Sequence, residues 1–357
     1  MNKDNRVLKP LKIGELVAEK PIIQGGMGVG VSRSSLAGAV AAEGGIGIIS
    51  TAQIGYDEEG FEKDQAGCNR IAIKKHIKRA KEIAGGKGLV GVNIMVALKH
   101  YKEHVQEAVK AGADVIISGA GLPMDLPKLV GENVTKIAPI VSSKRAAQLI
   151  LKMWAHRYNR TADFIVVEGP KAGGHLGFSK EQLQDIDKLD YDQEIRDIIE
   201  CTKDYEEKFQ RKIPVIVAGG IFDRKDIEHV MKLGADGVQI ASRFVATEEC
   251  DASDAYKQAY IQAEKKNIQI IQSPVGMPGR ALRNEFIKGL ETARKPITKC
   301  YNCLEKCDPR TVPYCITKAL IEAVQGNVEN GLIFCGENVD RIHEMTTVHD
   351  LMNELCY

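Results

Sequence analysis

The feature that most constrains this fold is a unit of three parts: a helical stretch, then a glycine, then a short apolar run. It occurs at residues 36–50, 104–118 and 226–242. In the third example Ile227, Val230 and Met231 have the i, i+3, i+4 spacing of one apolar helix face. Gly234 follows them, as is typical of a residue that ends a helix. Because the apolar runs hardly alternate with polar residues, we expect strands that are buried on both faces.

Eight apolar runs of this kind are predicted to be the strands of the fold. They lie at residues 21–24, 46–50, 89–95, 114–118, 138–142, 164–168, 214–218 and 237–241. Most intervals between them have helical periodicity, so the strands should be parallel. Eight such units favour an α/β fold of the (β/α)8 TIM-barrel type over an open doubly wound sheet.

Two stretches are longer than these units need. Residues 178–212 are highly charged and amphipathic, and we predict a helical insertion there that passes over the C-terminal face of the barrel after strand six. Residues 251–357 are predicted to form a helical, cysteine-containing appendix, a lid or a homodimer surface, packed on the barrel. The predicted organisation is therefore a barrel at residues 1–250, which includes the insertion, and an appendix at 251–357.

Charge and composition exclude several classes of protein. The formal net charge of +1 gives no electrostatic case for binding nucleic acid or an anionic membrane surface. No apolar run is long enough to span a bilayer, and the polar residues 1–6 contain no signal-peptide apolar region. The nine cysteines are an odd number spread along the chain, which argues against a disulfide framework. We therefore expect a cytoplasmic protein with a small-molecule ligand.

The loops after strands seven and eight are where this fold commonly binds phosphate. Gly219 and Gly220 follow strand seven, and their backbone N–H groups could approach an anion closely. Ala241 and Ser242 end strand eight and add N–H groups and a hydroxyl. The alternative is a pair of ordinary tight turns, but the position of both pairs favours a phosphate site.

The loop after strand one, GGMGVGVS at residues 25–32, looks like a dinucleotide-binding fingerprint. Such a fingerprint also requires an acidic residue at the end of the second strand, where this chain has Ser50 and Thr51. We therefore reject the dinucleotide interpretation. The glycines are better explained as backbone that lies against a flat ring.

His175 lies in the glycine-rich loop after strand six, directly behind Gly173 and Gly174. Its ordinary pKa is near neutrality, so it could act as a base or stabilise an anion in the predicted site. The other histidines lie mostly on charged helices. His76, His100 and His104 are interpreted as residues of solvated faces.

Lys144 and Glu168 come at the ends of neighbouring strands, and two interpretations of them are open. The lysine could contact a negative group of a cofactor while the glutamate accepts hydrogen bonds from ribityl or ribose hydroxyls. Alternatively, the two side chains form a salt bridge with each other.

Four cysteines lie close together in KCYNCLEKCDPRTVPYC, at positions 300, 303, 307 and 315. The Cys-x2-Cys element suggests zinc or an iron–sulfur cluster. However, the spacing after Cys303 matches no common zinc ribbon, and buried reduced thiols are the alternative. We therefore predict no metal site, and the role of these cysteines stays open.

Six stretches taken together resemble the nitronate monooxygenase family, formerly called 2-nitropropane dioxygenases, whose relative is the FMN-dependent enoyl-ACP reductase II. They are PIIQGGMG, AEGGIGIIS, GVNIMV, EGPKAGGHLGF, PVIVAGGI and GADGVQIASRFVATEE. The resemblance runs from about residue 11 to 250, and we expect the charged insertion and the appendix to make this chain long for the family.

The resemblance implies a TIM barrel that holds FMN, with His175 as the active-site histidine. It implies phosphate contacts at Gly219, Gly220, Ala241 and Ser242. It further implies that the rest of the flavin is contacted by Gly25, Gly26, Met27, Asn93, Lys144, Glu168, Ala172, Gly173, Gly174 and Gln239.

The activity implied is the oxidation of alkyl nitronates by O2 to a carbonyl compound and nitrite. The alternative is an FMN reductase that uses NAD(P)H as co-substrate and acts on an enoyl thioester or a quinone. A third hypothesis is a non-catalytic sensor of a phosphate ligand, in which the cysteine-rich tail responds to redox state or metal.

Overall fold

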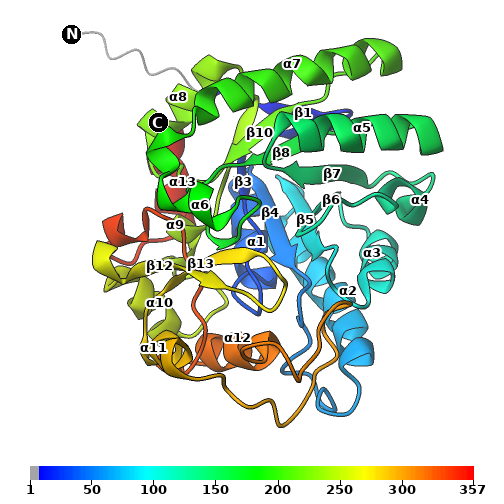
Figure 1. The fold of residues 1–357 in the computed structure, drawn as a ribbon. Helices are drawn as coiled ribbons and strands as arrows, with labels where there is room; N and C mark the ends of the chain where they lie inside the picture. The colour runs from blue at the N-terminus through cyan, green and yellow to red at the C-terminus, as the bar shows by residue number, and fades with distance from the viewer. Residues whose placement is uncertain (1–7) are drawn as a thin grey trace.

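Eight parallel strands close into a barrel in the computed structural model, which describes residues 8–357 (Figure 1). The strands are β3 (Ile22–Gln24), β4 (Ile46–Ser50), β5 (Leu89–Met95), β6 (Val115–Gly119), β7 (Lys136–Val141), β8 (Ile165–Glu168), β10 (Val215–Ala218) and β11 (Gly237–Ile240). The barrel closes where β11 pairs with β3, for example Gln239 with Ile23. The predicted (β/α)8 TIM barrel is confirmed, and each predicted strand lies within two residues of its observed bounds.

Both faces of these strands are buried, as their apolar runs predicted. Inside the barrel, Ile23, Ile48 and Val166 belong to one apolar cluster. That cluster continues into a hairpin that the sequence did not reveal, formed by β1 (Leu11–Ile13) and β2 (Leu16–Ala18). Leu11 and Ile13 pack into the barrel interior, so the hairpin closes its N-terminal end. Strands of three residues are too short to show a clear period in sequence.

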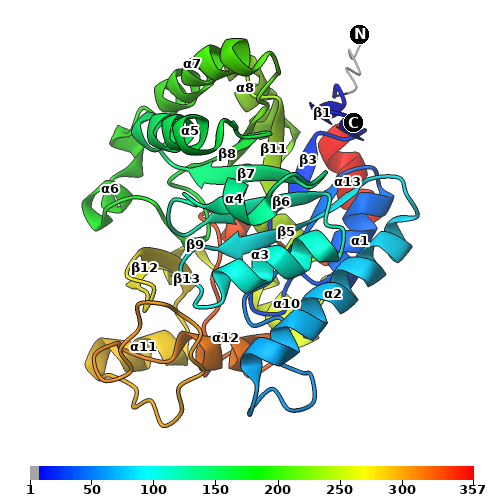
Figure 2. The same cartoon turned by 90° about the vertical axis from the view of Figure 1, so that its right-hand side faces the viewer.

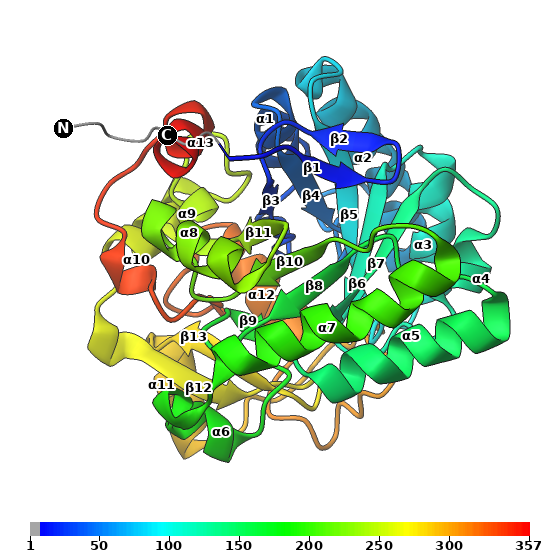
Figure 3. The ribbon, with the colours of Figure 1, turned by 90° about the horizontal axis from the view of Figure 1, so that it is seen from above.

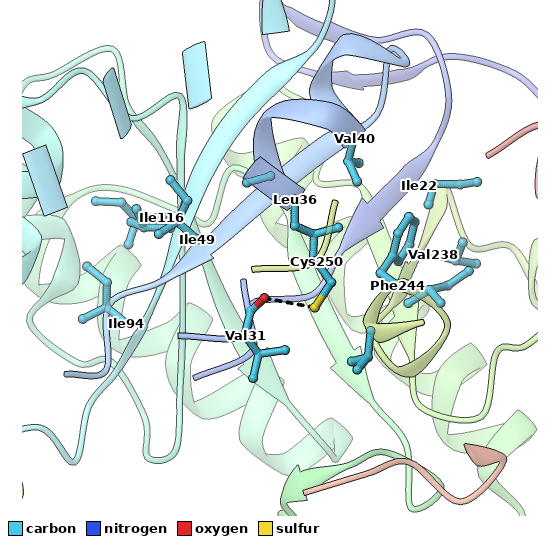
Figure 4. Packing of buried hydrophobic residues seen from close by; sticks show 14 of the residues in the cluster. Ile22, Val31, Leu36, Val40, Ile49, Ile94, Ile116, Val238, Phe244 and Cys250 are labelled. Atoms are coloured by element: carbon cyan, nitrogen blue, oxygen red, sulfur yellow. Dashed lines mark hydrogen bonds between the residues drawn. The ribbon is translucent and has the colours of Figure 1, made fainter. Parts of the chain in front are cut away.

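The outer faces of the strands pack against a ring of helices. The helices after the first seven strands are α1 (Ser34–Ala42), α2 (Gln65–Ala84), α3 (Tyr101–Lys110), α4 (Leu126–Val130), α5 (Lys144–Tyr158), α7 (Tyr191–Phe209) and α8 (Arg224–Leu233). Figure 4 shows Leu36 and Val40 of α1 beside Phe244 and Cys250, whose thiol donates to the Val31 carbonyl oxygen at 3.4 Å. Gly234 ends α8 with φ +110°, the conformation predicted for a helix-terminating glycine.

The ring is completed by the last helix, α13 (Val348–Cys356), which packs on α1, α8 and the short α9 (Ser242–Val245) (Figure 3). The segment predicted as an appendix therefore supplies the eighth barrel helix. The helices predicted after strand six are present, but the longer one, α7, packs between α5 and α8 as the sixth barrel helix. It does not pass over the C-terminal face as expected, and only α6 (Lys180–Gln184) and a short 3-10 turn at Ile186–Lys188 are additional.

The remaining appendix lies at the end of the barrel opposite the β1–β2 hairpin (Figure 2). It contains α10 (Asp254–Ile261), β12 (Ile268–Gln272), β13 (Pro278–Leu282), α11 (Glu285–Thr292) and α12 (Ile316–Val324), with 3-10 turns at Lys265–Asn267 and Val339–Arg341. Strand β13 pairs antiparallel with β12 and also with β9 (Gly174–His175) in the loop after β8. The appendix is thus joined by backbone hydrogen bonds to the loop that carries His175. None of the helices formed by the described residues is long and apolar enough to cross a bilayer.

Candidate functional site

A cavity of about 390 Å³ opens at the C-terminal ends of the barrel strands, which is the end where this fold places its active sites. Its volume is within the range of pockets that bind small molecules and cofactors. The sequence-predicted site residues that line it are Gly25, Gly26, Met27, Asn93, Glu168, Ala172, Gly173, Gly174, His175, Gly219, Gly220, Gln239, Ala241 and Ser242. Lys144 is not among the lining residues.

Unused main-chain donors mark one end of the cavity. Gly219 and Gly220 have φ of +89° and +92°, values that favour glycine. Among residues 8–357, the N–H groups of Gly219, Gly220 and Ser242 donate to no protein acceptor. The Ser242 hydroxyl accepts the Gly336 N–H at 3.0 Å, which ties this end to the appendix. Main-chain donors without protein partners that face one cavity can bind an anion such as a phosphate.

The loop after β3 forms a wall without side chains. A Cβ atom on Gly26 would lie 2.5 Å from the Cβ of Asn93, so only glycine fits there. A Cβ on Gly25 would be 3.3 Å from Cγ of Gln239. The amide groups of Asn93 and Gln239 make no hydrogen bond to protein among the described residues, and both residues line the cavity. A flat ligand with polar edges would fit against this wall.

Glu168 ends β8 and lines the cavity, and its carboxyl has no protein partner in residues 8–357. Burial raises the pKa of this carboxyl to about 8. The salt bridge considered between Lys144 and Glu168 does not form, because the Lys144 ammonium lies 3.4 Å from the Asp197 carboxylate of α7. Lys144 is the first residue of α5, and its side chain turns outward to the neighbouring helix.

The His175 imidazole is in the wall of the same cavity. Its Nε2 lies 2.7 Å from Oγ of Ser273, and the Phe334 ring meets it edge-on at a centroid distance of 5.0 Å. Burial lowers the pKa of His175 to about 4. The imidazole is therefore neutral at physiological pH, the form that can accept a proton.

The appendix holds the loop before His175 in place. Arg280 of β13 is only 2% exposed, and its guanidinium donates to the carbonyl oxygens of Pro170, at 2.9 Å, and Ala172. The same guanidinium pairs with Glu337 at 2.8 Å. A Cβ on Gly173 would be 2.6 Å from the carbonyl carbon of Cys335, so this loop packs backbone to backbone on the appendix.

Sequence reasoning missed this whole contribution of the appendix, in particular Ser273, Arg280 and Phe334. The only local feature of the sequence that could have indicated this contribution is Arg280, within the apolar and glycine-rich stretch VGMPGRAL at 275–282. A charged residue in such a stretch is typical of a buried, paired group, but nothing in the sequence named its partners.

The interpretation of the helix histidines was wrong for two of them. His76 and His104 are 8% and 3% exposed, and burial lowers the pKa of each to about 4. Their Nδ1 atoms lie 2.9 Å from the Ser34 hydroxyl and 3.1 Å from the Thr51 hydroxyl, respectively. His100 and His104 border a second, smaller cavity of about 190 Å³.

All nine cysteines are free thiols. Burial raises the pKa of Cys303 to about 11, and the neighbouring thiols of Cys307 and Cys315 contribute to that rise. In residues 8–357 no three His, Cys, Asp or Glu side chains are arranged so that they could hold a metal ion. Of the four clustered thiols, Cys300 is exposed and Cys303, Cys307 and Cys315 are only partly buried, so the interpretation as buried thiols was wrong. The absence of a metal site stays a prediction, and the role of the cluster stays open.

Comparison with known proteins identifies relatives along nearly the whole chain. The sequence model of the nitronate monooxygenase family matches residues 9–357. The match extends beyond residues 11–250, the stretch that carried the resemblance, and includes the appendix. The chain is 23% identical to a probable nitronate monooxygenase of Bacillus subtilis, over 94% of this chain and 95% of the relative.

Another relative is named for a reaction on a coenzyme A compound. The chain is 27% identical to (3aS,4S,5R,7aS)-5-hydroxy-7a-methyl-1-oxo-octahydro-1H-indene-4-carboxyl-CoA dehydrogenase of Mycobacterium tuberculosis, over 78% of this chain and 67% of the relative.

Two solved structures are similar to this fold. FabK from Thermotoga maritima superposes with a TM-score of 0.71 and 26% identity, over 96% of this chain and 93% of that chain. A nitroalkane oxidase from Streptomyces ansochromogenes superposes with a TM-score of 0.69 and 20% identity, over 94% of each chain. The second likeness shows the fold alone.

The raised pKa of Glu168 predicts how the stability of the ligand-free protein depends on pH. Between pH 4.5 and about 8 the folded protein keeps this proton while the unfolded chain loses it, so the free energy of unfolding should fall as pH rises. Glu168→Gln stays neutral and should avoid this loss. Water in the cavity weakens the effect of burial. We therefore expect the free energy of unfolding of Glu168→Gln, relative to that of wild type, to increase by roughly 1–3 kcal/mol from pH 5 to pH 8.5, measured by urea unfolding.

Glu59→Gln, at an exposed position, is the matched control and should follow wild type at both pH values. An identical pH dependence in wild type and Glu168→Gln would show that the carboxyl is not strained by burial.

Proposed function

We propose, from the premise that this chain belongs to the nitronate monooxygenase family, that it oxidises alkyl nitronates with O2 to a carbonyl compound and nitrite, using FMN. Family membership makes the chain an oxidoreductase and implies that it uses a flavin. The observation that carries the finer proposal is one cavity that combines a neutral imidazole with unpaired main-chain donors. The first group suits proton transfer, and the second suits a cofactor phosphate.

The residues present fit FMN. The free N–H groups of Gly219, Gly220 and Ser242 would bind its phosphate. The Glu168 carboxyl, which has no protein partner among the described residues, would accept hydrogen bonds from ribityl hydroxyls. That acceptor role favours its ionised form, so binding should lower the pKa of Glu168 again.

The isoalloxazine ring would lie against the wall formed by Gly25, Gly26 and Met27. The unpaired amides of Asn93 and Gln239 would bind its polar edges, and Ala172, Gly173 and Gly174 would border it on the other side. Lys144 is left out of this proposal because its ammonium pairs with Asp197.

The chain's own groups would prepare the substrate for oxidation. When a neutral nitroalkane is offered, the unprotonated His175 imidazole takes the proton from the carbon beside the nitro group, and the nitronate forms. Apolar lining residues such as Leu122, Ile140 and Met277 would hold the alkyl part and keep water away. The flavin, when bound, supplies the electron-accepting chemistry that a protein side chain cannot.

The alternative is a reductase that uses NAD(P)H on an enoyl thioester or a quinone, with the same flavin site. It is favoured by the Mycobacterium tuberculosis relative, which is named for a carboxyl-CoA compound. Anaerobic addition of NADPH and, separately, of ethyl nitronate to the purified yellow protein distinguishes the two. Bleaching by the nitronate alone supports nitronate oxidation, and rapid bleaching by NADPH supports the reductase.

The proposed role of His175 predicts that His175→Ala keeps its flavin but loses turnover of neutral nitroalkanes. The loss should be about 100-fold or more in kcat/KM, because a positioned general base contributes that much. Oxygen consumption measures the rate, and the absorbance spectrum measures the flavin. His343→Ala, at an exposed histidine, should behave as wild type. Unchanged turnover in His175→Ala would remove this residue from the mechanism.

The proposed phosphate site predicts that Gly219→Ala binds FMN at least about tenfold more weakly than wild type, because the added methyl displaces the loop. The new Cβ would lie 2.9 Å from the carbonyl oxygen of Gly169 and 3.0 Å from the N atom of Ala172. Gly60→Ala is the matched control, since Gly60 has a similar φ of +85° and nothing within 4 Å of an added Cβ. Fluorescence titration of FMN measures both. Equal affinities for the two variants would contradict the phosphate assignment.

A further inference from the structure

We propose that Ser273 is the positioning residue for His175, holding the ring by Nε2 so that Nδ1 receives the substrate proton. The two residues are 98 positions apart in sequence, and Ser273 belongs to the turn between β12 and β13 in the appendix. Its Oγ lies 2.7 Å from Nε2 of His175. This inference rests on the proposed function, because it assigns the atom that carries out the proton transfer.

The backbone around the contact places the hydroxyl firmly. Gly279 of β13 pairs with His175 of β9, and the Leu176 N–H donates to the Pro278 carbonyl at 2.9 Å. The turn itself is closed by hydrogen bonds from the Ser273 N–H to the Met277 carbonyl and from the Gly276 N–H to the Ser273 carbonyl. Ser273 is 2% exposed, so water does not compete for its hydroxyl. The hydroxyl therefore lies on the turn that joins β12 and β13, and the imidazole lies on β9, which pairs with β13.

The surroundings of the hydroxyl favour one arrangement of protons. The Ser273 Oγ accepts the Val275 N–H at 3.3 Å, and it can accept Nε2–H of His175 with its other lone pair. The nearby Tyr314 hydroxyl is buried and makes no hydrogen bond among the described residues, and burial raises its pKa while Ser273 lowers it; the Ser273 proton can therefore turn toward Tyr314 when Nε2 keeps its own proton. With its proton on Nε2, the ring has an unprotonated Nδ1.

Nδ1 is free to act as the base. Among residues 8–357 this nitrogen makes no hydrogen bond, and it is not fully buried, so a ligand can reach it. The Phe334 ring packs edge-on against the imidazole and limits its rotation. Burial lowers the pKa of His175 and no charged side chain in the described part contributes, so the ring rests neutral.

The step that Ser273 supports is a simple proton transfer. The proton on the α-carbon of a neutral nitroalkane moves to Nδ1, and the electron pair of that C–H bond becomes the C=N bond of the nitronate. The negative charge passes to the nitro oxygens, and no oxidation occurs in this step. The imidazolium that forms keeps its Nε2–H bond to the Ser273 oxygen, which stabilises the new positive charge.

The test compares one nitroalkane offered in two forms to the flavin-loaded enzyme. Nitroethane requires the proton transfer, whereas ethyl nitronate has already lost its proton. In Ser273→Ala we expect kcat with nitroethane to fall about tenfold or more, as for a misplaced general base, while kcat/KM with ethyl nitronate changes less than about twofold. Ser273→Thr keeps a hydroxyl and should recover much of the loss. Gln272→Ala, at the exposed last residue of β12, should match wild type.

An equal loss with both forms of the substrate would assign Ser273 a merely structural role and overturn the proposal, as would no loss with either. A second measurement does not depend on turnover. The nitrogen NMR signals of His175, identified by their absence in His175→Asn, should show a proton on Nε2 in wild type and a mixture of tautomers in Ser273→Ala. A wild-type ring with its proton on Nδ1 would overturn the proposal even if the enzyme acts on another substrate. Absence of turnover of both forms in wild type, with the expected NMR result, would instead reject the proposed function alone.

Discussion

Parallel pairing around the whole barrel is the constraint on which the site depends. Because the eight barrel strands run in one direction and close on themselves, all eight carboxyl ends meet on one face. Side chains and main-chain groups that follow different strands along the chain are thereby brought to one cavity. The β1–β2 hairpin fills the other end with Leu11 and Ile13, so the apolar interior is continuous up to the floor of the site.

The barrel alone does not complete this site. The loop between β8 and His175 is glycine-rich, and such a loop loses much conformational freedom when it is ordered. The buried guanidinium of Arg280 binds two of its carbonyl oxygens, and Glu337 balances the charge. A buried cation is tolerated when it is paired and hydrogen-bonded in this way. The appendix is therefore part of the site, and the match of the family to residues 9–357 agrees with that arrangement.

Two titratable groups with opposite pKa shifts share the cavity. Burial raises the pKa of Glu168 to about 8 and lowers that of His175 to about 4, because in each case it disfavours the charged form. Both groups are thus neutral near pH 7 before a ligand binds. The neutral imidazole has a free lone pair that can accept a proton, although the burial that lowers its pKa also makes it a weaker base. A carboxyl without a hydrogen-bond partner in the protein can be ionised by hydrogen bonds from a ligand. The burial of Glu168 and His175, more than their residue types, therefore sets the protonation state in which each can act.

The sequence by itself determined the barrel, its eight strands, the glycine loops and the position of His175 in the loop after a strand, because apolar period and turn residues are local properties of a chain. Only the tertiary structure decided which way side chains point and what docks on each loop. Lys144 follows a strand as expected but turns to Asp197, and His104 is on a polar helix yet buried. Ser273 meets His175 across 98 residues, and no local pattern encodes a contact between a turn and a loop so far apart.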